Sequence, residues 1–249
     1  MKTVLITGCS SGFGLDTARL FLDRSWRVIA TMRTPREDLL PASDALQVIP
    51  LDVTDPASVA RAVAAAGPID VLVNNAGFGA PAPFELTPME TVRQLFDTNT
   101  FGTAALTQAV LPHMRQRGSG VIVNVTSSVT LKPLPLVSMY RAAKAAVNAM
   151  TESLAGEVAP FGIRVHLVLP GSSGETRFRE TAHHHLQGMD DPVYGDFMKQ
   201  TIARMMASIG PGTHARDVAE AVWKAATDPA APLRIPAGAD AVQWAAEAG

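Results

Sequence analysis

Short apolar runs separated by amphipathic stretches form the main pattern of this chain. The runs are rich in valine, isoleucine and leucine, and they lie at residues 4–6, 27–32, 46–51, 69–73, 121–125, 163–169 and 233–235. Most are apolar along their whole length, which is typical of strands buried on both faces of a parallel sheet. Between the first two runs, Leu15, Ala18 and Leu22 recur at helical spacing. The alternation predicts an α/β fold, a doubly wound seven-stranded parallel sheet with helices on both faces.

Several helices have recognisable ends. Asp55 followed by Pro56 predicts an N-cap with proline at N1, opening a helix over residues 57–66. Thr87 and Glu90 are spaced as a capping box, which predicts the start of a long, interrupted helix reaching about residue 117. Two further helices are expected over residues 139–158 and 214–227. With no linker or repeat to divide the chain, residues 1–249 are predicted to form a single domain.

The alternation stops between residues 172 and 209. This stretch contains Phe178, a run of three histidines (183–185) and four of the ten methionines, Met189, Met198, Met205 and Met206. A long segment of this kind inside a compact domain is more often a functional lid than a plain loop. Its methionines favour an adaptable apolar wall for a substrate. Three adjacent histidines cannot easily converge on one ion, so no metal site is predicted.

Composition narrows the possible functions. A net charge of -2 with mixed signs leaves no basic footprint for nucleic acid. No apolar run approaches the length of a membrane span, and the N-terminus does not resemble a signal peptide. Cys9 is the only cysteine, which excludes an intramolecular disulfide and a multi-cysteine metal site. A cytoplasmic location is the expectation.

A glycine-rich turn follows the first apolar run. It comprises the candidate phosphate-binding residues Gly8, Ser10, Ser11, Gly12, Phe13 and Gly14. Glycines at such a turn let backbone amides approach a pyrophosphate, and the N-terminus of the following helix favours negative charge. Glycines can also end strands for steric reasons alone, but the position after the first strand favours nucleotide binding.

The end of the second run bears on which nucleotide is bound. A carboxylate there would hold the ribose diol of NAD, but the chain has Arg33 and no acidic residue before Glu37. Arg33 can pair with a 2′-phosphate, and the Ser11 hydroxyl can add a hydrogen bond. A surface arginine after a strand is the plain alternative. Because the carboxylate is also missing, NADP is favoured over NAD.

Tyr140 and Lys144 form a candidate proton-transfer pair. Four residues apart on a predicted helix, they share one face. A phenol has an ordinary pKa of about 10, and a neighbouring ammonium favours its ionised form. Ser127, delivered by the preceding strand, can hold a substrate oxygen beside the phenol. Taken alone, this spacing favours the plain reading of a packed aromatic and a solvated lysine, and the motifs elsewhere in the chain reverse that preference.

Taken together, these motifs resemble the short-chain dehydrogenase/reductase family over essentially the whole chain. The resemblance rests on Thr7-Gly8-x-x-x-Gly12-x-Gly14, Asp52-Val53, Asn74-Asn75-Ala76-Gly77, Asn99, Ser127, Tyr140-x-x-x-Lys144 and Pro170-Gly171, in that order. Within the family, the chain is similar to the NADP-preferring hydroxysteroid and retinol dehydrogenase branch. The resemblance implies a Rossmann fold, NADP(H) as cofactor, and hydride transfer between nicotinamide and a carbonyl or secondary alcohol.

The resemblance also implies a role for each matching residue. Tyr140 would be the acid/base, Ser127 would position the substrate oxygen, and Lys144 would bind the nicotinamide ribose and lower the pKa of Tyr140. Asn99 would hold a helix kink and a water of the proton relay. The cofactor would contact Asp52, Val53, Asn75, Ala76, Gly77, Pro170 and Gly171. Thr176 lies one residue later than the family pattern places it, so its contact with the carboxamide stays open.

Spacing selects Ser127 over its neighbour. Ser127 lies 13 residues before Tyr140 and three after Asn124, as in the family, and Ser128 is the alternative. The resemblance implies a homodimer or homotetramer built on the helices over about 89–117 and 139–158. The expected substrate is a small-molecule carbonyl or alcohol, apolar in view of the methionines between residues 172 and 209. A nucleotide-binding regulator without turnover is the rival from another class. A serine hydrolase is disfavoured because Gly118-Ser119-Gly120 precedes a strand instead of following one.

Overall fold

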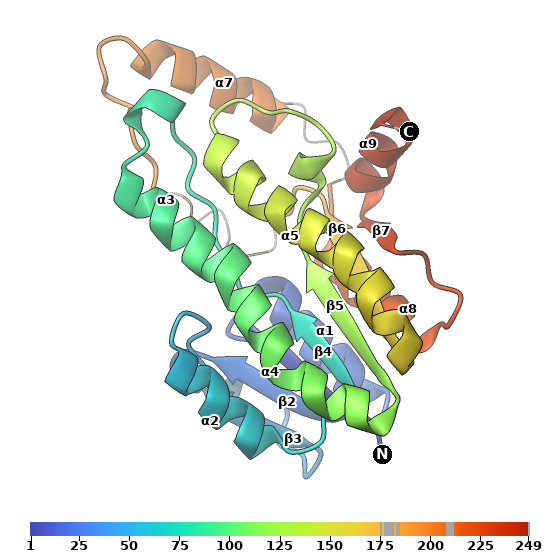
Figure 1. Ribbon diagram of the computed structural model, residues 1–249. Coiled ribbons are helices and arrows are strands. Elements are labelled where there is room, and N and C mark those ends of the chain that lie inside the picture. Colours follow the sequence, from blue (N-terminus) through green and yellow to red (C-terminus); the bar gives the residue numbers. More distant parts are fainter. Residues whose placement is uncertain (175, 177–181, 183–184, 208–211, 249) are drawn as a thin grey trace.

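A seven-stranded sheet runs through the centre of the protein (Figure 1). The computed structural model describes residues 1–174, 176, 182, 185–207 and 212–248. Its strands are β1 (Thr3–Thr7), β2 (Arg27–Met32), β3 (Leu46–Pro50), β4 (Val71–Asn74), β5 (Gly120–Val125), β6 (Ile163–Pro170) and β7 (Arg234–Ala237). Their order is β3-β2-β1-β4-β5-β6-β7, and every neighbouring pair is parallel. The predicted α/β doubly wound sheet is confirmed.

Helices cover both faces of this sheet. α1 (Gly12–Asp23) and α8 (Ala215–Thr227) pack together on one face, and α2 (Pro56–Ala66), α4 (Gly102–Arg117) and α5 (Ser138–Val158) lie on the other (Figure 1). Successive strand residues point to opposite faces, so Val4 and Ile6 join the core under α1 while Leu5 joins the core under α2. Both faces are therefore apolar, which explains why the strands read as unbroken apolar runs.

The long helix after residue 88 is interrupted, as predicted, but its start differs. α3 (Met89–Phe96) passes through a π-helical turn (Asp97–Phe101) into α4. The predicted capping box is wrong: Pro88 is the N-cap, and no side chain caps it. The Thr87 hydroxyl instead donates to the carbonyl of Pro83, 2.9 Å away, closing the 3₁₀ turn Phe84–Leu86. By contrast, the Asp55 carboxylate accepts from the Ala57 amide and caps α2 as expected.

Two helices complete the C-terminal third. α7 (Gly195–Ala207) lies within the segment in which no regular element was expected, and α9 (Ala239–Ala248) follows β7 unpredicted. Gly238, with a φ of +96°, turns the chain from β7 into α9. The shorter 3₁₀ turns are Glu37–Leu39, Ser128–Thr130 and Ala159–Phe161. Among the helices described, none combines the length and apolar character that a membrane crossing requires.

Candidate active site

A cavity of about 530 Å³ opens at the carboxyl ends of β1 and β4. This is the point where the strand order reverses, the place where open α/β sheets bind ligands. Of the residues predicted to bind a cofactor, those that line it are Gly8, Ser10, Ser11, Gly12, Phe13, Arg33, Asp52, Val53, Asn75, Ala76, Gly77 and Thr176. The structure thus brings together residues spread over most of the chain.

The glycine-rich turn has the geometry that a phosphate cradle needs. Gly8 and Gly12 have φ angles of +74° and +58°, which favour glycine. A Cβ on Gly14 would lie 2.5 Å from both the Asn75 Nδ2 atom and the Gly8 carbonyl oxygen. The turn therefore folds tightly against the end of β4 and presents the N-terminus of α1 to the cavity.

Hydrogen bonds join the ends of β1 and β4 beneath this turn. The Thr7 hydroxyl accepts from the backbone amides of Asn75 and Ala76, at 2.9 and 2.8 Å. The Asn75 side chain donates to the Thr7 carbonyl at 2.8 Å. Asn75 thus supports the turn at the same time as it lines the cavity, and both strand ends hold a fixed relative position.

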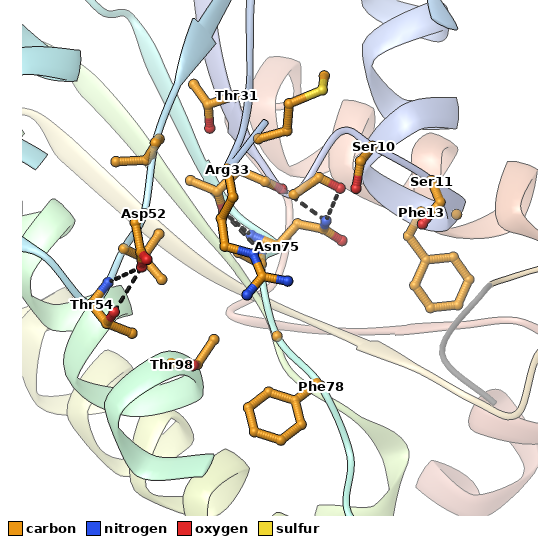
Figure 2. A pocket seen from close by; sticks show the side chains of 18 of the residues that line it. Ser10, Ser11, Phe13, Thr31, Arg33, Asp52, Thr54, Asn75, Phe78 and Thr98 are labelled. Carbon is orange, nitrogen blue, oxygen red and sulfur yellow. Dashed lines mark hydrogen bonds between the residues drawn. The ribbon is translucent and has the colours of Figure 1, made fainter. Parts of the chain in front are cut away.

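The far end of the cavity is open and charged. Arg33 is exposed, and Figure 2 shows its side chain extending past Asn75 across the cavity. Asp52 accepts from the amide and the hydroxyl of Thr54, at 2.9 and 2.7 Å. These bonds, with a smaller effect of the Arg33 charge, hold the pKa of the Asp52 carboxyl below its ordinary value. Asp52 is thereby kept as an anion whose oxygens are already partly engaged.

Four residues predicted for chemistry form a buried group beside the cavity. Asn99, Ser127, Tyr140 and Lys144 are between 1% and 8% exposed. The Ser127 side chain hydrogen-bonds the Tyr140 phenol, and the Lys144 Nζ atom donates to the Val125 carbonyl at 3.0 Å. None of the four is among the lining residues of the cavity itself. The connection runs through Gly77, where a Cβ would lie 2.3 Å from Asn99 Oδ1 and 3.2 Å from Lys144 Nζ.

Burial changes the acidity of this group in a direction that sequence reasoning did not anticipate. Burial raises the pKa of Tyr140 to about 12, against a smaller lowering by the Ser127 hydrogen bond. Burial also lowers the pKa of Lys144 to about 8. The expected lowering of the Tyr140 pKa is therefore not found in this structure. Desolvation disfavours the phenolate more than its neighbours stabilise it.

Asn99 sits in the π-helical turn, where a helix kink was expected. Its Oδ1 atom accepts from the Phe78 amide at 3.1 Å, and its Nδ2 atom donates to the Phe78 carbonyl at 3.0 Å. Both ends of the side-chain amide are thus held by one residue. This pairing anchors the chain after β4 to the helix interruption and places Gly77 against Lys144.

Some site features lay beyond the sequence motifs. Phe78 and His185 line the cavity with their rings 4.9 Å apart, and only the tertiary fold brings these two segments together. Thr176 packs on the phosphate turn, where a Cβ on Gly12 would lie 3.0 Å from its Cβ. Pro170 ends β6 and Gly171 follows it, and neither lines the cavity. Phe178 and the other two histidines, 183 and 184, lie outside the described residues.

Comparisons with known proteins agree with this geometry. The family model for the short chain dehydrogenases matches residues 2–187. The chain is 35% identical to a 3-ketodihydrosphingosine reductase of Bacteroides thetaiotaomicron, over 95% of this chain and 88% of that protein. The chain belongs to the short-chain dehydrogenase/reductase family. It is therefore assigned to the oxidoreductases that act on alcohol and carbonyl groups with nicotinamide cofactors.

Solved structures of the family agree with the fold. A 3-ketoacyl-(acyl-carrier-protein) reductase from Brucella melitensis, complexed with NADH, has a TM-score of 0.79 and 29% identity, covering 94% of this chain and 96% of that chain. A short chain dehydrogenase from Burkholderia cenocepacia, in complex with NADP, has a TM-score of 0.78 and 28% identity, covering 99% and 93%. Both nicotinamide cofactors thus occur among these neighbours.

Proposed function

We propose that this protein is an NADP(H)-dependent reductase of an apolar ketone or aldehyde, with Tyr140 as its acid/base. The observation that carries the proposal is the Ser127–Tyr140 hydrogen bond, buried beside Lys144 and next to the cofactor cavity. A pure nucleotide binder has no need of a buried phenol donor in contact with a second hydroxyl. The same machinery runs in the opposite direction with the alcohol as substrate.

A nicotinamide cofactor held in the cavity would supply the hydride that the carbonyl carbon receives. Tyr140 gives its phenolic proton to the carbonyl oxygen, which completes the alcohol and leaves a phenolate. Ser127 donates a hydrogen bond to that oxygen as negative charge develops on it. Lys144, as an ammonium, stabilises the phenolate. The electrostatic attraction between the two charges is strong because this position is buried and poorly screened by water.

The preference for NADP(H) rests on the charge at the open end of the cavity. Arg33 is exposed there, and the end of β2 carries no carboxylate to hold a ribose diol. A guanidinium matches the oxygens of a 2′-phosphate in a bidentate geometry. The Ser11 hydroxyl makes no cap hydrogen bond to α1, which leaves it suited to the same phosphate.

The preference for an apolar substrate rests on the segment over residues 172–209, which we assign as the lid. Met198 is fully buried, and the His185 ring lies 4.9 Å from the Phe78 ring, tilted by 35°, where both residues line the cavity. The Tyr194 phenol donates to Glu85 at 2.7 Å and joins this segment to the loop before α3. The related protein from Bacteroides thetaiotaomicron is named a 3-ketodihydrosphingosine reductase, and this name supports reduction of a ketone as the direction of the reaction.

A homo-oligomer built on α4 and α5 completes the proposal. Phe101 directly precedes α4 and is 59% exposed, and Phe161 lies three residues after the end of α5 and is 44% exposed. Apolar side chains of this size on a surface are suited to a second copy. Light scattering coupled to gel filtration distinguishes a dimer or tetramer from a monomer of 26.3 kDa.

The decisive test measures NADPH consumption by the purified protein with a panel of apolar ketones, aldehydes, quinones and steroids, with NADH in parallel. Turnover with NADPH well above NADH is the expected result. Turnover favouring NADH would overturn the role of Arg33 and leave the chemistry standing. Tight NADPH binding without turnover on any compound would favour the regulator instead.

A further inference from the structure

The C-terminal helix contacts the end of β6 through a small hydrogen-bond network. One carboxylate oxygen of Asp240, in the first turn of α9, accepts from the Ser172 amide at 2.6 Å. Its other oxygen accepts from the Thr213 hydroxyl at 2.7 Å. That hydroxyl in turn accepts from the Gly171 amide at 3.0 Å. Asp240 and Thr213 thus hold the two residues with which the chain leaves β6.

Two glycines make room for this network. A Cβ on Gly171 would lie 2.0 Å from the Asp240 Oδ1 atom, and a Cβ on Gly238 would lie 2.0 Å from the Thr213 Oγ1 atom. No larger residue fits at either position without displacing the polar group. The carboxylate and the hydroxyl therefore sit directly on backbone at the carboxyl end of β6, where Pro170 pairs with Ala237.

The held residues lie close in sequence to a residue that lines the cofactor cavity. Ser172 is four positions before Thr176, which lines that cavity and packs on Gly12 in the phosphate turn. Thr213 is almost fully buried, and its amide donates back to the Ser172 carbonyl at 2.8 Å. The two residues that follow β6 are thus held in place by Thr213 and by Asp240, which come from two other segments of the chain.

We infer that Asp240 is a positioning residue for cofactor binding, acting through Ser172 and Gly171 on the placement of Thr176 against the phosphate turn. Residues such as Gly171 and Ser172 that are held in place before binding reduce the entropy that is lost when the cofactor binds. The inference rests on the proposed function, because it assigns α9 a part in the affinity of that same cofactor cavity. The C-terminal helix is then part of the cofactor site although none of its residues lines the cavity among those described.

The test compares Asp240→Ala, Asp240→Asn and Glu247→Ala in the full chain. Loss of charge-assisted hydrogen bonds to Ser172 and Thr213 should weaken NADPH binding about tenfold in Asp240→Ala. Asparagine can still accept from the Ser172 amide while donating to the Thr213 hydroxyl, so its dissociation constant should stay within about threefold of wild type. Glu247→Ala removes a charge from the same helix, but its ion pair with Lys132 is exposed, and binding should not change.

Two readouts separate this role from a purely structural one. Fluorescence titration gives the dissociation constants for NADPH and NADH, and amide hydrogen exchange reports on the peptide over residues 168–174 without cofactor. Faster exchange in Asp240→Ala together with weaker binding supports the inference. Faster exchange with unchanged binding would overturn it, as would unchanged exchange. Wild-type protein that binds only NADH would overturn the proposed cofactor preference, and the NADH constants of the variants would then decide the role of Asp240.

Discussion

The two ends of the candidate site differ in their exposure to water. At one end Asn99, Ser127, Tyr140 and Lys144 are buried, and much of their hydrogen bonding is to backbone or to each other. At the other end Arg33 is exposed and Asp52 is only half-buried. Burial magnifies electrostatic effects and shifts pKa values, whereas an exposed charge acts weakly and is screened by salt. We therefore expect substitutions at the buried end to change the rate of chemistry, and those at the open end to change cofactor choice.

The largest effect is expected from Tyr140→Phe, which removes the proposed proton donor. Turnover should fall by about 10³-fold, within the range of general acid catalysis, while the dissociation constant for NADPH stays nearly unchanged. The matched control is Tyr194→Phe at the only other tyrosine, whose phenol donates to Glu85 on the surface. Steady-state kinetics and a fluorescence titration provide both numbers. Near-normal turnover in Tyr140→Phe would remove that residue from the mechanism.

A second effect should separate Ser127 from Ser128. Ser127→Ala removes a hydroxyl that contacts Tyr140, and should lower kcat by about 10²-fold, as the loss of one donor to a developing oxyanion does. Ser128→Ala at the adjacent buried position should lower kcat only slightly. Measuring kcat for both variants with the best ketone tests the choice. A larger loss in Ser128→Ala would transfer the role to Ser128.

The open end should respond more weakly. Arg33→Ala should raise the KM for NADPH about tenfold and leave the KM for NADH almost unchanged, because one exposed phosphate contact is lost. Arg36→Ala is the matched control. Arg36 lies three residues after Arg33 in the sequence and forms an ion pair with Asp38 on the surface. Added salt should weaken NADPH binding more in wild type than in Arg33→Ala. Equal effects on both cofactors would contradict the phosphate contact.

The smallest effect is a pH dependence set by the buried lysine. The pKa of Lys144 is lowered to about 8, so its ammonium form predominates below pH 8 and its neutral form above. The pKa of Tyr140 is raised to about 12, so the phenol stays protonated throughout this range. Because kcat/KM for NADPH reports groups of the cofactor-free protein, it should decline above a midpoint near pH 8 in the reduction. A profile that is flat from about pH 6 to 10 would contradict this assignment.

The sequence alone predicted the strands of the sheet well, because the pattern that marks a buried strand lies within the strand itself. Unbroken apolar runs mark strands buried on both faces, and the Asp55-Pro56 pair marks a helix start without reference to the rest of the chain. The glycine turn was recognisable for the same reason, since a positive φ at Gly8 depends on the turn itself. The predicted capping box is wrong because the helix begins one residue later, with Pro88 as its N-cap, and the Thr87 hydroxyl instead donates to the Pro83 carbonyl, a contact that the spacing rule does not consider.

The tertiary structure alone decided properties that depend on distant neighbours. The shifted pKa values of Tyr140 and Lys144 come from burial, which is set by packing and not by the four-residue spacing between them. The contact of Phe78 with His185 and that of Asp240 with Ser172 join residues far apart in the chain, and no local pattern encodes such distances. The sequence determined which groups are available for chemistry, and folding determined their acidity and their partners.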